Sequence, residues 1–278
     1  MSATLYIVST PIGNLDDISH RAIKVLNQVN LIAAEDTRHS ARLLQHYAIN
    51  TPMQAYHEFG GDAQTETLFR YLAQGKSIAL ISDAGTPLIS DPGYRLVARA
   101  HREGVQVVPV PGACALVAAL SASGLATDSF CFEGFMPAKS KARRDRLQAL
   151  IHEDRTLIFY EAPHRVLECL QDMCELLGAD RRISLARELT KTYETILQTT
   201  LAGMCEWVAA DSNQRRGEIV LVVEGARPQE RTELDDKARQ LVALLLSEMP
   251  PRKACKIVAD WCGIPKKTVY DYILSLKK

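Results

Sequence analysis

The chain has 278 residues, with 33 Lys and Arg balanced by 33 Asp and Glu, so it carries no net charge. This length suits roughly two domains with sizeable cores, and a neutral total gives no sign of a polyanionic partner except where charge is local. The seven cysteines include no C-x-x-C pair, which argues against a disulfide framework or a zinc site. The sequence opens with no secretory leader and holds no apolar run of about 18 residues, so we expect a soluble, cytoplasmic protein without a membrane partner.

The first predicted element is a strand over residues 5–8, an apolar run rich in β-formers. A constrained loop, 9–15, follows it and leads into a helix over about 19–28. The loop occupies the place of a nucleotide-binding turn but lacks G-x-G-x-x-G, which argues against an NAD-type site.

A second buried strand, 31–34, ends in the polar run Glu35-Asp36-Thr37-Arg38-His39. Two acids, a hydroxyl, Arg and His at a strand end form a candidate functional cluster. Alternatively, Asp36 or Thr37 caps the next helix, which runs to Tyr47, and Arg38 pairs locally. The sequence leaves both readings open.

The segment 82–93 follows a strand over 77–81 and precedes a helix over 94–102; another helix is expected over 65–73. It contains two prolines, two glycines, Asp83 and Asp91. Glycine permits unusual dihedrals and close backbone approach, and the carboxyl end of a strand is where open α/β sheets bind ligands. A tight turn with Asp91 as helix N-cap is the alternative.

A fourth strand, 105–110, runs into a loop at 109–115 and a small-residue helix over 116–123. Three strand ends are thus followed by Pro/Gly loops, at 10–14, 83–93 and 109–115. Alternating strands and helices with such loops predict a largely parallel sheet whose carboxyl ends form one cleft.

Beyond residues 124–129 the composition changes, and strands at 130–137, 156–160, 183–186 and 217–225 predict a second α/β domain with a mixed sheet. The run 139–146 holds five basic residues and one acid. It is either a solvated helix start or a patch that contacts phosphates.

After a polar linker, 226–233, helices are expected over 234–246, 252–261 and 265–276, with a turn at Gly263. The last two match a helix-turn-helix outline. Residues 252–278 contain seven Lys or Arg and two acids, a net charge of +5. This favours a nucleic-acid contact over a helical cap. The predicted domains are 1–124, 125–228 and 232–278.

Six motifs together resemble the tetrapyrrole-methylase-like superfamily: 9–15, 35–38, 82–93, 110–112, 159–165 and 187–191. Within it, they are most similar to the branch of bacterial small-subunit ribosomal RNA cytidine 2′-O-methyltransferases. The resemblance implies two α/β domains with S-adenosylmethionine in the cleft between them, a homodimer, and ribosomal RNA of the small subunit as partner.

The resemblance also implies which residues form the site. The expected cofactor contacts are Pro11, Ile12, Gly13, Asp83, Ala84, Gly85, Thr86, Ile89, Ala113, Cys114, Ala115, Tyr160, Glu161, Ala162, Leu189, Glu218 and Ile219. The catalytic candidates are Asp36, Arg38, Glu188, Lys191 and Glu194, and Glu161 and His164 are second-choice candidates.

The expected reaction is in-line methyl transfer from a sulfonium to a ribose oxygen, which needs alignment, removal of a proton and no metal. A ribose hydroxyl is a weak acid, so either a base or a cation that stabilises the developing oxyanion is useful. Lys191 could act as the base only if burial or a neighbouring cation such as Arg187 lowered its pKa. Two other functions are open to the same chain. A methyltransferase acting on a small tetrapyrrole would leave the basic tail unexplained, and a non-catalytic nucleic-acid-binding regulator would leave the cleft without a role.

Overall fold

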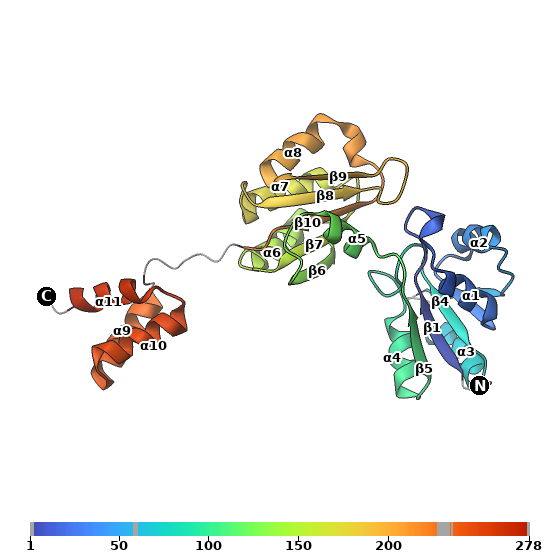
Figure 1. The fold of residues 1–278 in the computed structure, drawn as a ribbon, viewed down its shortest axis with the longest axis horizontal. Coiled ribbons are helices and arrows are strands. Elements are labelled where there is room, and N and C mark those ends of the chain that lie inside the picture. The colour runs from blue at the N-terminus through green and yellow to red at the C-terminus, as the bar shows by residue number, and fades with distance from the viewer. Residues whose placement is uncertain (1–2, 58–60, 227–233, 235, 277–278) are drawn as a thin grey trace. The chain divides into compact units, whose positions relative to one another are not determined.

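A computed structural model describes residues 3–57, 61–226, 234 and 236–276. The chain divides into two compact units, residues 1–226 and 227–278, and each is described by itself. The first unit contains two sheets of five strands each, and the second is helical (Figure 1).

The first sheet has the strand order β3-β2-β4-β1-β5, and every pair in it is parallel. Its strands are β1 (Thr4–Val8), β2 (Leu31–Ala34), β3 (Met53–Ala55), β4 (Ile78–Ile81) and β5 (Gln106–Val110). The prediction of a parallel sheet is therefore confirmed. The short edge strand β3 was not predicted, because three half-buried residues carry no hydrophobic pattern.

Helices cover both faces of this sheet, as a parallel sheet requires. On one face, α1 (His20–Gln28) and α2 (Thr37–His46) bury Leu26 and Leu44 against Ile32 and Ala79. On the other, α3 (Gly61–Ala73) and α4 (Tyr94–Arg102) pack with the alternate strand residues. A 3₁₀ turn, η1 (Leu15–Asp17), follows β1. Helix α3 begins four residues before the predicted start at residue 65.

The second sheet has the order β6-β7-β10-β8-β9. Its strands are β6 (Phe130–Phe135), β7 (Thr156–Glu161), β8 (Arg182–Arg187), β9 (Thr195–Thr200) and β10 (Ile219–Val223). Strands β6 and β7 are parallel, whereas the other pairs are antiparallel, so the predicted mixed sheet is confirmed.

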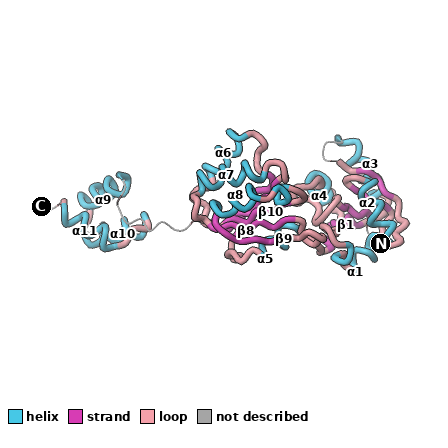
Figure 2. The backbone as a smooth tube through the Cα atoms, turned by 90° about the horizontal axis from the view of Figure 1, so that it is seen from above, coloured by secondary structure: helices cyan, strands magenta, loops and turns pink. Residues whose placement is uncertain are grey.

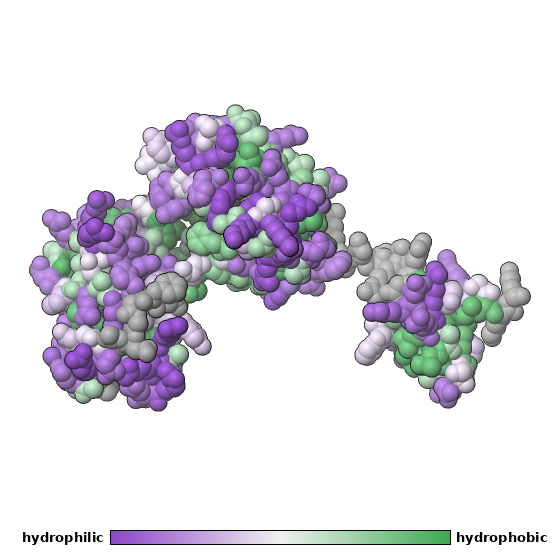
Figure 3. Space-filling model, turned by 180° about the vertical axis from the view of Figure 1, so that it is seen from behind, coloured by the Kyte–Doolittle hydropathy of each residue, from purple (hydrophilic) through white to green (hydrophobic). Residues whose placement is uncertain are grey.

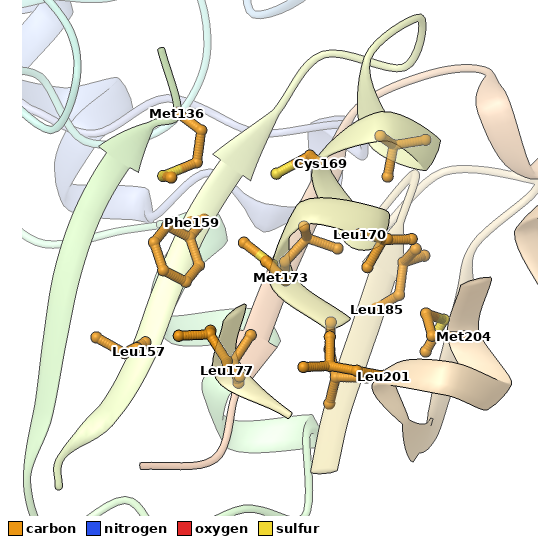
Figure 4. Close-up of a cluster of buried hydrophobic side chains, with 14 of the residues drawn as sticks. Met136, Leu157, Phe159, Cys169, Leu170, Met173, Leu177, Leu185, Leu201 and Met204 are labelled. Atoms are coloured by element: carbon orange, nitrogen blue, oxygen red, sulfur yellow. The ribbon is translucent and has the colours of Figure 1, made fainter. Parts of the chain in front are cut away.

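One face of this sheet is covered by α6 (Ser140–Ala149), α7 (Val166–Leu177) and α8 (Leu201–Ala210). Figure 4 shows its core, where Phe159 and Leu185 of the sheet face Leu170 and Met173 of α7. A 3₁₀ turn, η2 (Ser212–Arg215), separates α8 from β10.

The opposite face is covered by α5 (Ala115–Ala122), which directly follows the first sheet in the chain. Leu116 and Leu120 of α5 pack with Val220 and Val222 of β10. Helix α5 therefore packs on the second sheet and joins the two α/β halves (Figures 1 and 2). The boundary at residue 124 stays a prediction.

The C-terminal unit contains α9 (Asp236–Glu248), α10 (Pro251–Cys262) and α11 (Lys266–Ser275). Pro251 opens α10, where a missing N–H is harmless, and Gly263 ends it in the left-handed region at φ 63°. Val258, Val269 and Ile273 form its own core with Val242. The predicted helix-turn-helix is present, with ends within two residues of those expected. Most of the predicted linker lies outside the described residues.

Candidate active site

The three Pro/Gly loops of the first sheet meet at the carboxyl ends of β4, β1 and β5, which are neighbours in the sheet. Thr10 and Gly85 exchange two backbone hydrogen bonds, with N–O distances of 2.9 and 3.1 Å. The Thr86 hydroxyl lies 2.9 Å from the Ser9 hydroxyl and donates to the Ala113 carbonyl at 3.0 Å. The loops are thus fastened to one another.

The loop between β4 and α4 holds four residues in the left-handed region: Gly85 (φ 83°), Leu88 (73°), Ser90 (68°) and Gly93 (140°). Each non-glycine residue there costs about 1 to 2 kcal/mol, a strain that functional loops often carry. Gly93 is the N-cap position of α4 and makes no side-chain cap. The alternative reading of Asp91 as the N-cap is therefore wrong.

Between these loops and the second sheet lies a cavity of about 340 Å³, a size that suits a small-molecule ligand. Its predicted lining residues are Ile12, Ala84, Gly85, Thr86, Ile89, Cys114, Ala115, Tyr160, Glu161, Ala162, Leu189, Glu218 and Ile219. The sequence prediction missed Ser90, Asp91, Phe135, Pro163, Gly217 and Val220. Ser90, Asp91 and Pro163 lie within predicted motifs but were not named as contacts, and Gly217 and Val220 lie in the predicted strand 217–225 next to named contacts, whereas no motif includes Phe135.

Four predicted cofactor residues do not line this cavity. Ala113 supports it by accepting the Thr86 hydrogen bond, and Asp83 accepts from the Asp36 backbone N–H at 3.0 Å. Gly13 lines the neighbouring groove described below. Pro11 lies in the fastened loop beside Ile12.

Two acids of the cavity lining, Asp91 and Glu161, lie in different surroundings. Burial raises the pKa of Asp91 to about 6, with the carboxylates of Glu35 and Asp83 adding to the shift and a hydrogen bond with Ser82 opposing it. Glu161 is buried, and its Oε1 accepts from the Ala162 N–H at 2.7 Å and pairs with Arg165 at 2.8 Å. Burial, and then the charge of Glu161 and a hydrogen bond with it, raise the pKa of the Cys169 thiol, so the Glu161 carboxylate lies beside Cys169 in the core formed with α7.

A second hollow, of about 810 Å³, lies beside the cavity. It is lined by Gly13, Asn14, Leu15, Asp16, His46, Glu188, Thr190, Lys191, Thr192 and Tyr193, and is called the groove below. Leu189 and Glu218 line the cavity, while Glu188, Thr190 and Lys191 line the groove. The segment 188–191 therefore separates the two hollows.

This segment is held in a strained form. Glu188 and Thr190 have φ angles of 53° and 65°. A Cβ on Gly13 would lie 2.8 Å from the Leu189 carbonyl oxygen and 2.7 Å from the Thr190 hydroxyl, so only glycine allows the first domain to approach this closely. Such strain at a domain junction is typical of a functional site.

Lys191 is fixed by two carboxylates: its Nζ lies 2.8 Å from Glu188 Oε1 and 3.1 Å from Glu218 Oε2. Partial burial opposes the charged form, but these hydrogen bonds outweigh it and raise the pKa of Lys191. For Glu188, burial is likewise outweighed by Lys191 and by the Glu218 N–H, which lower its pKa. Lys191 could act as a base only with a lowered pKa, and its pKa is raised instead.

The other three catalytic candidates line neither hollow. The Asp36 carboxylate caps α2 by accepting from the N–H groups of Arg38 and His39, which lower its pKa, and it lies 3.5 Å from the exposed Arg38 guanidinium. Glu194 accepts from the Thr190 N–H at 2.6 Å and closes the turn that follows β8. Capping and local pairing, the alternative left open for Asp36 and Arg38, are thus what the structure shows.

The basic run 139–146 is largely neutralised. Arg143 is buried and pairs with Asp172 at 2.6 Å, Arg144 pairs with Asp172 and Glu175, and Arg146 pairs with Glu133. These arginines tie α6 to α7 and β6. The structure therefore favours a structural role for this run over a phosphate-contacting one.

Two family models match the chain: tetrapyrrole (corrin/porphyrin) methylases over residues 4–205, and the RsmI C-terminal HTH domain over residues 232–277. The chain is 55% identical to ribosomal RNA small subunit methyltransferase I of Pseudomonas aeruginosa, across 99% of this chain and 98% of that one. This protein belongs to the ribosomal RNA small subunit methyltransferase I family. The family member from Haemophilus influenzae is 51% identical, with coverage of 99% and 98%, and the one from Synechocystis is 44% identical, with 98% of both chains covered.

Solved structures share the fold of this family member at low identity. The methyltransferase CobJ has a TM-score of 0.60 and 19% identity, covering 81% of this chain and 95% of its own. Uroporphyrin-III C-methyltransferase from Thermus thermophilus, in complex with S-adenosylhomocysteine, has a TM-score of 0.55 and 16% identity, covering 80% and 97%. No helix among the described residues is long and apolar enough to cross a membrane.

Proposed function

We propose that this protein transfers a methyl group from S-adenosylmethionine to the ribose 2′-hydroxyl of a cytidine in small-subunit ribosomal RNA. The observation that carries the proposal is the 55% identity to a ribosomal RNA small subunit methyltransferase over 99% of the chain. This identity spans both α/β halves and the helical C-terminal unit, so the relative shares the whole architecture.

The cavity fits the proposed methyl donor. Its lining is mostly apolar and backbone, which suits an adenine face and an aliphatic chain, while the Asp91 carboxylate offers an acceptor for the donor's amino or hydroxyl groups. When bound, S-adenosylmethionine would supply a methyl group already activated by the sulfonium charge. In this proposal it is held by the 17 cofactor residues predicted from the sequence. Thirteen of them line the cavity, and Pro11, Gly13, Asp83 and Ala113 support the loops that carry the lining residues.

The groove is the proposed place for the ribose, because the segment 188–191 is shared between it and the cavity. Lys191 stays protonated there, and its ammonium lowers the free energy of the negative charge that develops on the attacking oxygen. As the O–CH₃ bond forms, the hydroxyl proton passes to water and the donor leaves as S-adenosylhomocysteine. Glu188 and Glu218 hold that ammonium in place. We also propose that Asp36, Arg38 and Glu194 contribute to catalysis indirectly, by holding the loops after β2 and β8 in place.

The two alternative functions have less support. A small-molecule methyltransferase on this scaffold has only fold-level support, from structures at 16 to 19% identity. A non-catalytic regulator leaves the cavity and the strained loop without a role. We further propose that the protein works in the cytoplasm as a homodimer, which size-exclusion chromatography with light scattering would test.

Nucleoside mass spectrometry of ribosomal RNA from a strain lacking this protein tests the proposal directly. We expect one 2′-O-methylcytidine to disappear and to return when the intact gene is supplied. A gene carrying Lys191→Ala is the matched control and should restore little or none. Unchanged ribosomal RNA methylation would refute the proposed reaction.

A further inference from the structure

The C-terminal unit presents large hydrophobic side chains to solvent although its own core is already closed. Trp261 is 83% exposed and Tyr270 51%, and Ile257 and Leu274 are exposed beside them at 42% and 45%. Figure 3 shows hydrophobic residues gathered on the visible face of this unit. Packing of the three helices does not need these side chains, so they are available to a ligand.

The exposed residues form two stripes with similar composition. On α10, Lys253, Ile257 and Trp261 follow one another at intervals of four, and on α11 so do Lys266, Tyr270 and Leu274. Residues four apart lie on the same side of a helix. An ion pair between Asp260 and Lys266, 3.7 Å long, brings the end of α10 next to the start of α11.

The cations of this unit differ from those of α6. No described residue forms an ion pair with Lys253, Lys256 or Lys267, whereas Arg143, Arg144 and Arg146 of α6 are all paired with carboxylates. Free ammonium groups can exchange their counterions for phosphates, which is the main source of affinity for nucleic acids. In the run 139–146 only Lys139 and Lys141 are likewise without an ion pair to a described residue, so most of its charge is neutralised, whereas most of the charge of the C-terminal segment is not.

The aromatic residues decide what form of nucleic acid fits. The major groove of an A-form RNA helix is too deep and narrow for a protein helix to read, so a helix-turn-helix cannot bind an RNA duplex as it binds DNA. Exposed aromatic rings between lysines instead suit unpaired bases, which stack on such rings whatever their identity.

We propose that the C-terminal unit binds unpaired nucleotides of the RNA substrate, with bases stacked on Trp261 and Tyr270 and phosphates on Lys253, Lys256 and Lys267. The inference rests on the proposed function for the identity of the substrate as RNA. It assigns to this unit the capture of the strand and leaves the methyl transfer to the cavity and the groove.

Tryptophan fluorescence gives a direct test, because the sequence has only two tryptophans, Trp207 and Trp261. Trp207 is half-buried against the core of the second sheet, and Trp207→Phe in the full chain leaves Trp261 as the only reporter. We expect an unstructured oligoribonucleotide to quench Trp261, and the same strand annealed to its complement to quench it far less. Equal quenching by the duplex, or none by either RNA, overturns the stacking proposal.

Substitutions in the full chain complete the test. Trp261→Ala and Tyr270→Ala should each weaken binding of the single strand by about fivefold to a hundredfold, and Tyr270→Phe should retain it. The matched control is Leu244→Ala, because Leu244 is 66% exposed on α9, outside both stripes. Unchanged affinity for the single strand in both alanine variants would also refute the proposal.

A second copy of this chain is the competing occupant. If Trp261 fluorescence shifts with protein concentration in the absence of RNA, the stripes form a protein interface and the RNA proposal is wrong. The proposed function is separable from this outcome: loss of 2′-O-methylcytidine in the deletion strain with no quenching of Trp261 would leave the reaction standing and remove only the capture surface.

Discussion

At the scale of single residues, Lys191 shows how neighbours decide what a side chain can do. The sequence identified it as a site residue but allowed it to be a base or a cation. Glu188 lies three positions away, but Glu218 reaches Lys191 only because β10 pairs with β8 and places Ile219 opposite Arg187. That pairing spans about 30 residues, so no local pattern could reveal that Lys191 is held protonated.

Removing this charge should affect turnover more than donor binding. We expect Lys191→Met to lower kcat about 100- to 1,000-fold, the usual effect of losing one group that stabilises a developing oxyanion, with the Kd of S-adenosylmethionine changed only a few fold. Lys191→Arg, the matched control, keeps the charge and should retain more turnover. Single-turnover kinetics and calorimetry measure the two effects, and wild-type turnover in Lys191→Met would remove it from the catalytic set.

Asp91 makes a prediction about pH. Its pKa of about 6 means that its carboxyl is protonated below that value, and a protonated carboxyl no longer attracts a sulfonium or ammonium cation. Affinity for S-adenosylmethionine should therefore be steady above about pH 7 and fall as the pH drops through 6. Asp91→Asn should bind more weakly at pH 8 and show a flatter profile.

Glu35 is the control for this profile, because burial and then the carboxylate of Asp83 raise its pKa as well. Glu35→Gln should keep most of the pH dependence if Asp91 causes it. S-adenosylhomocysteine, which lacks the sulfonium charge, should show a smaller change. A fall in affinity that survives in Asp91→Asn would contradict the assignment.

At the scale of elements, the sequence predicted those with a clear local signal. Buried strands such as β2 and β10, and loops rich in Pro and Gly, were identified within a residue or two. Strand β9 was not predicted because its threonines and Gln198 are partly exposed at a sheet edge and carry no apolar alternation. Phe135 was missed as a lining residue because only the pairing of β6 with β7 places it opposite Tyr160.

The loop between β4 and α4 can be tested with a matched pair of glycines. Gly85 and Gly75 have similar φ angles, 83° and 77°. A Cβ on Gly85 would lie 3.2 Å from Ile12 at the cavity, whereas a Cβ on Gly75 would have no described atom within 4 Å apart from those of its chain neighbours. Both valine variants should lose about 1 to 2 kcal/mol of unfolding free energy through backbone strain. Only Gly85→Val should also lose affinity for S-adenosylmethionine. Equal donor affinity in the two variants would exclude the loop from the site.

At the scale of the whole molecule, the two compact units predict that donor binding and RNA binding can be separated. The last residue of the first unit, Ala226, is held to that unit by a hydrogen bond from its N–H to the Glu153 carbonyl at 2.6 Å. A chain ending at Ala226 should therefore keep its fold and its affinity for S-adenosylmethionine while binding RNA more weakly. Circular dichroism, calorimetry and RNA binding measure the three properties. If the shortened chain methylated RNA as well as the full chain, the C-terminal unit would have no part in substrate capture.

The position of β10 also sets when the protein can fold during its synthesis. Strand β10 lies at the centre of the second sheet, yet it is the last of the five strands to be made. At about 5 to 20 residues per second, β7 exists for roughly 3 to 12 s before its partner emerges, with one edge open to wrong pairing. The first sheet has no such delay at its end, because β5, its last strand, is an edge strand. The nascent chain therefore completes its first sheet well before the cavity can close.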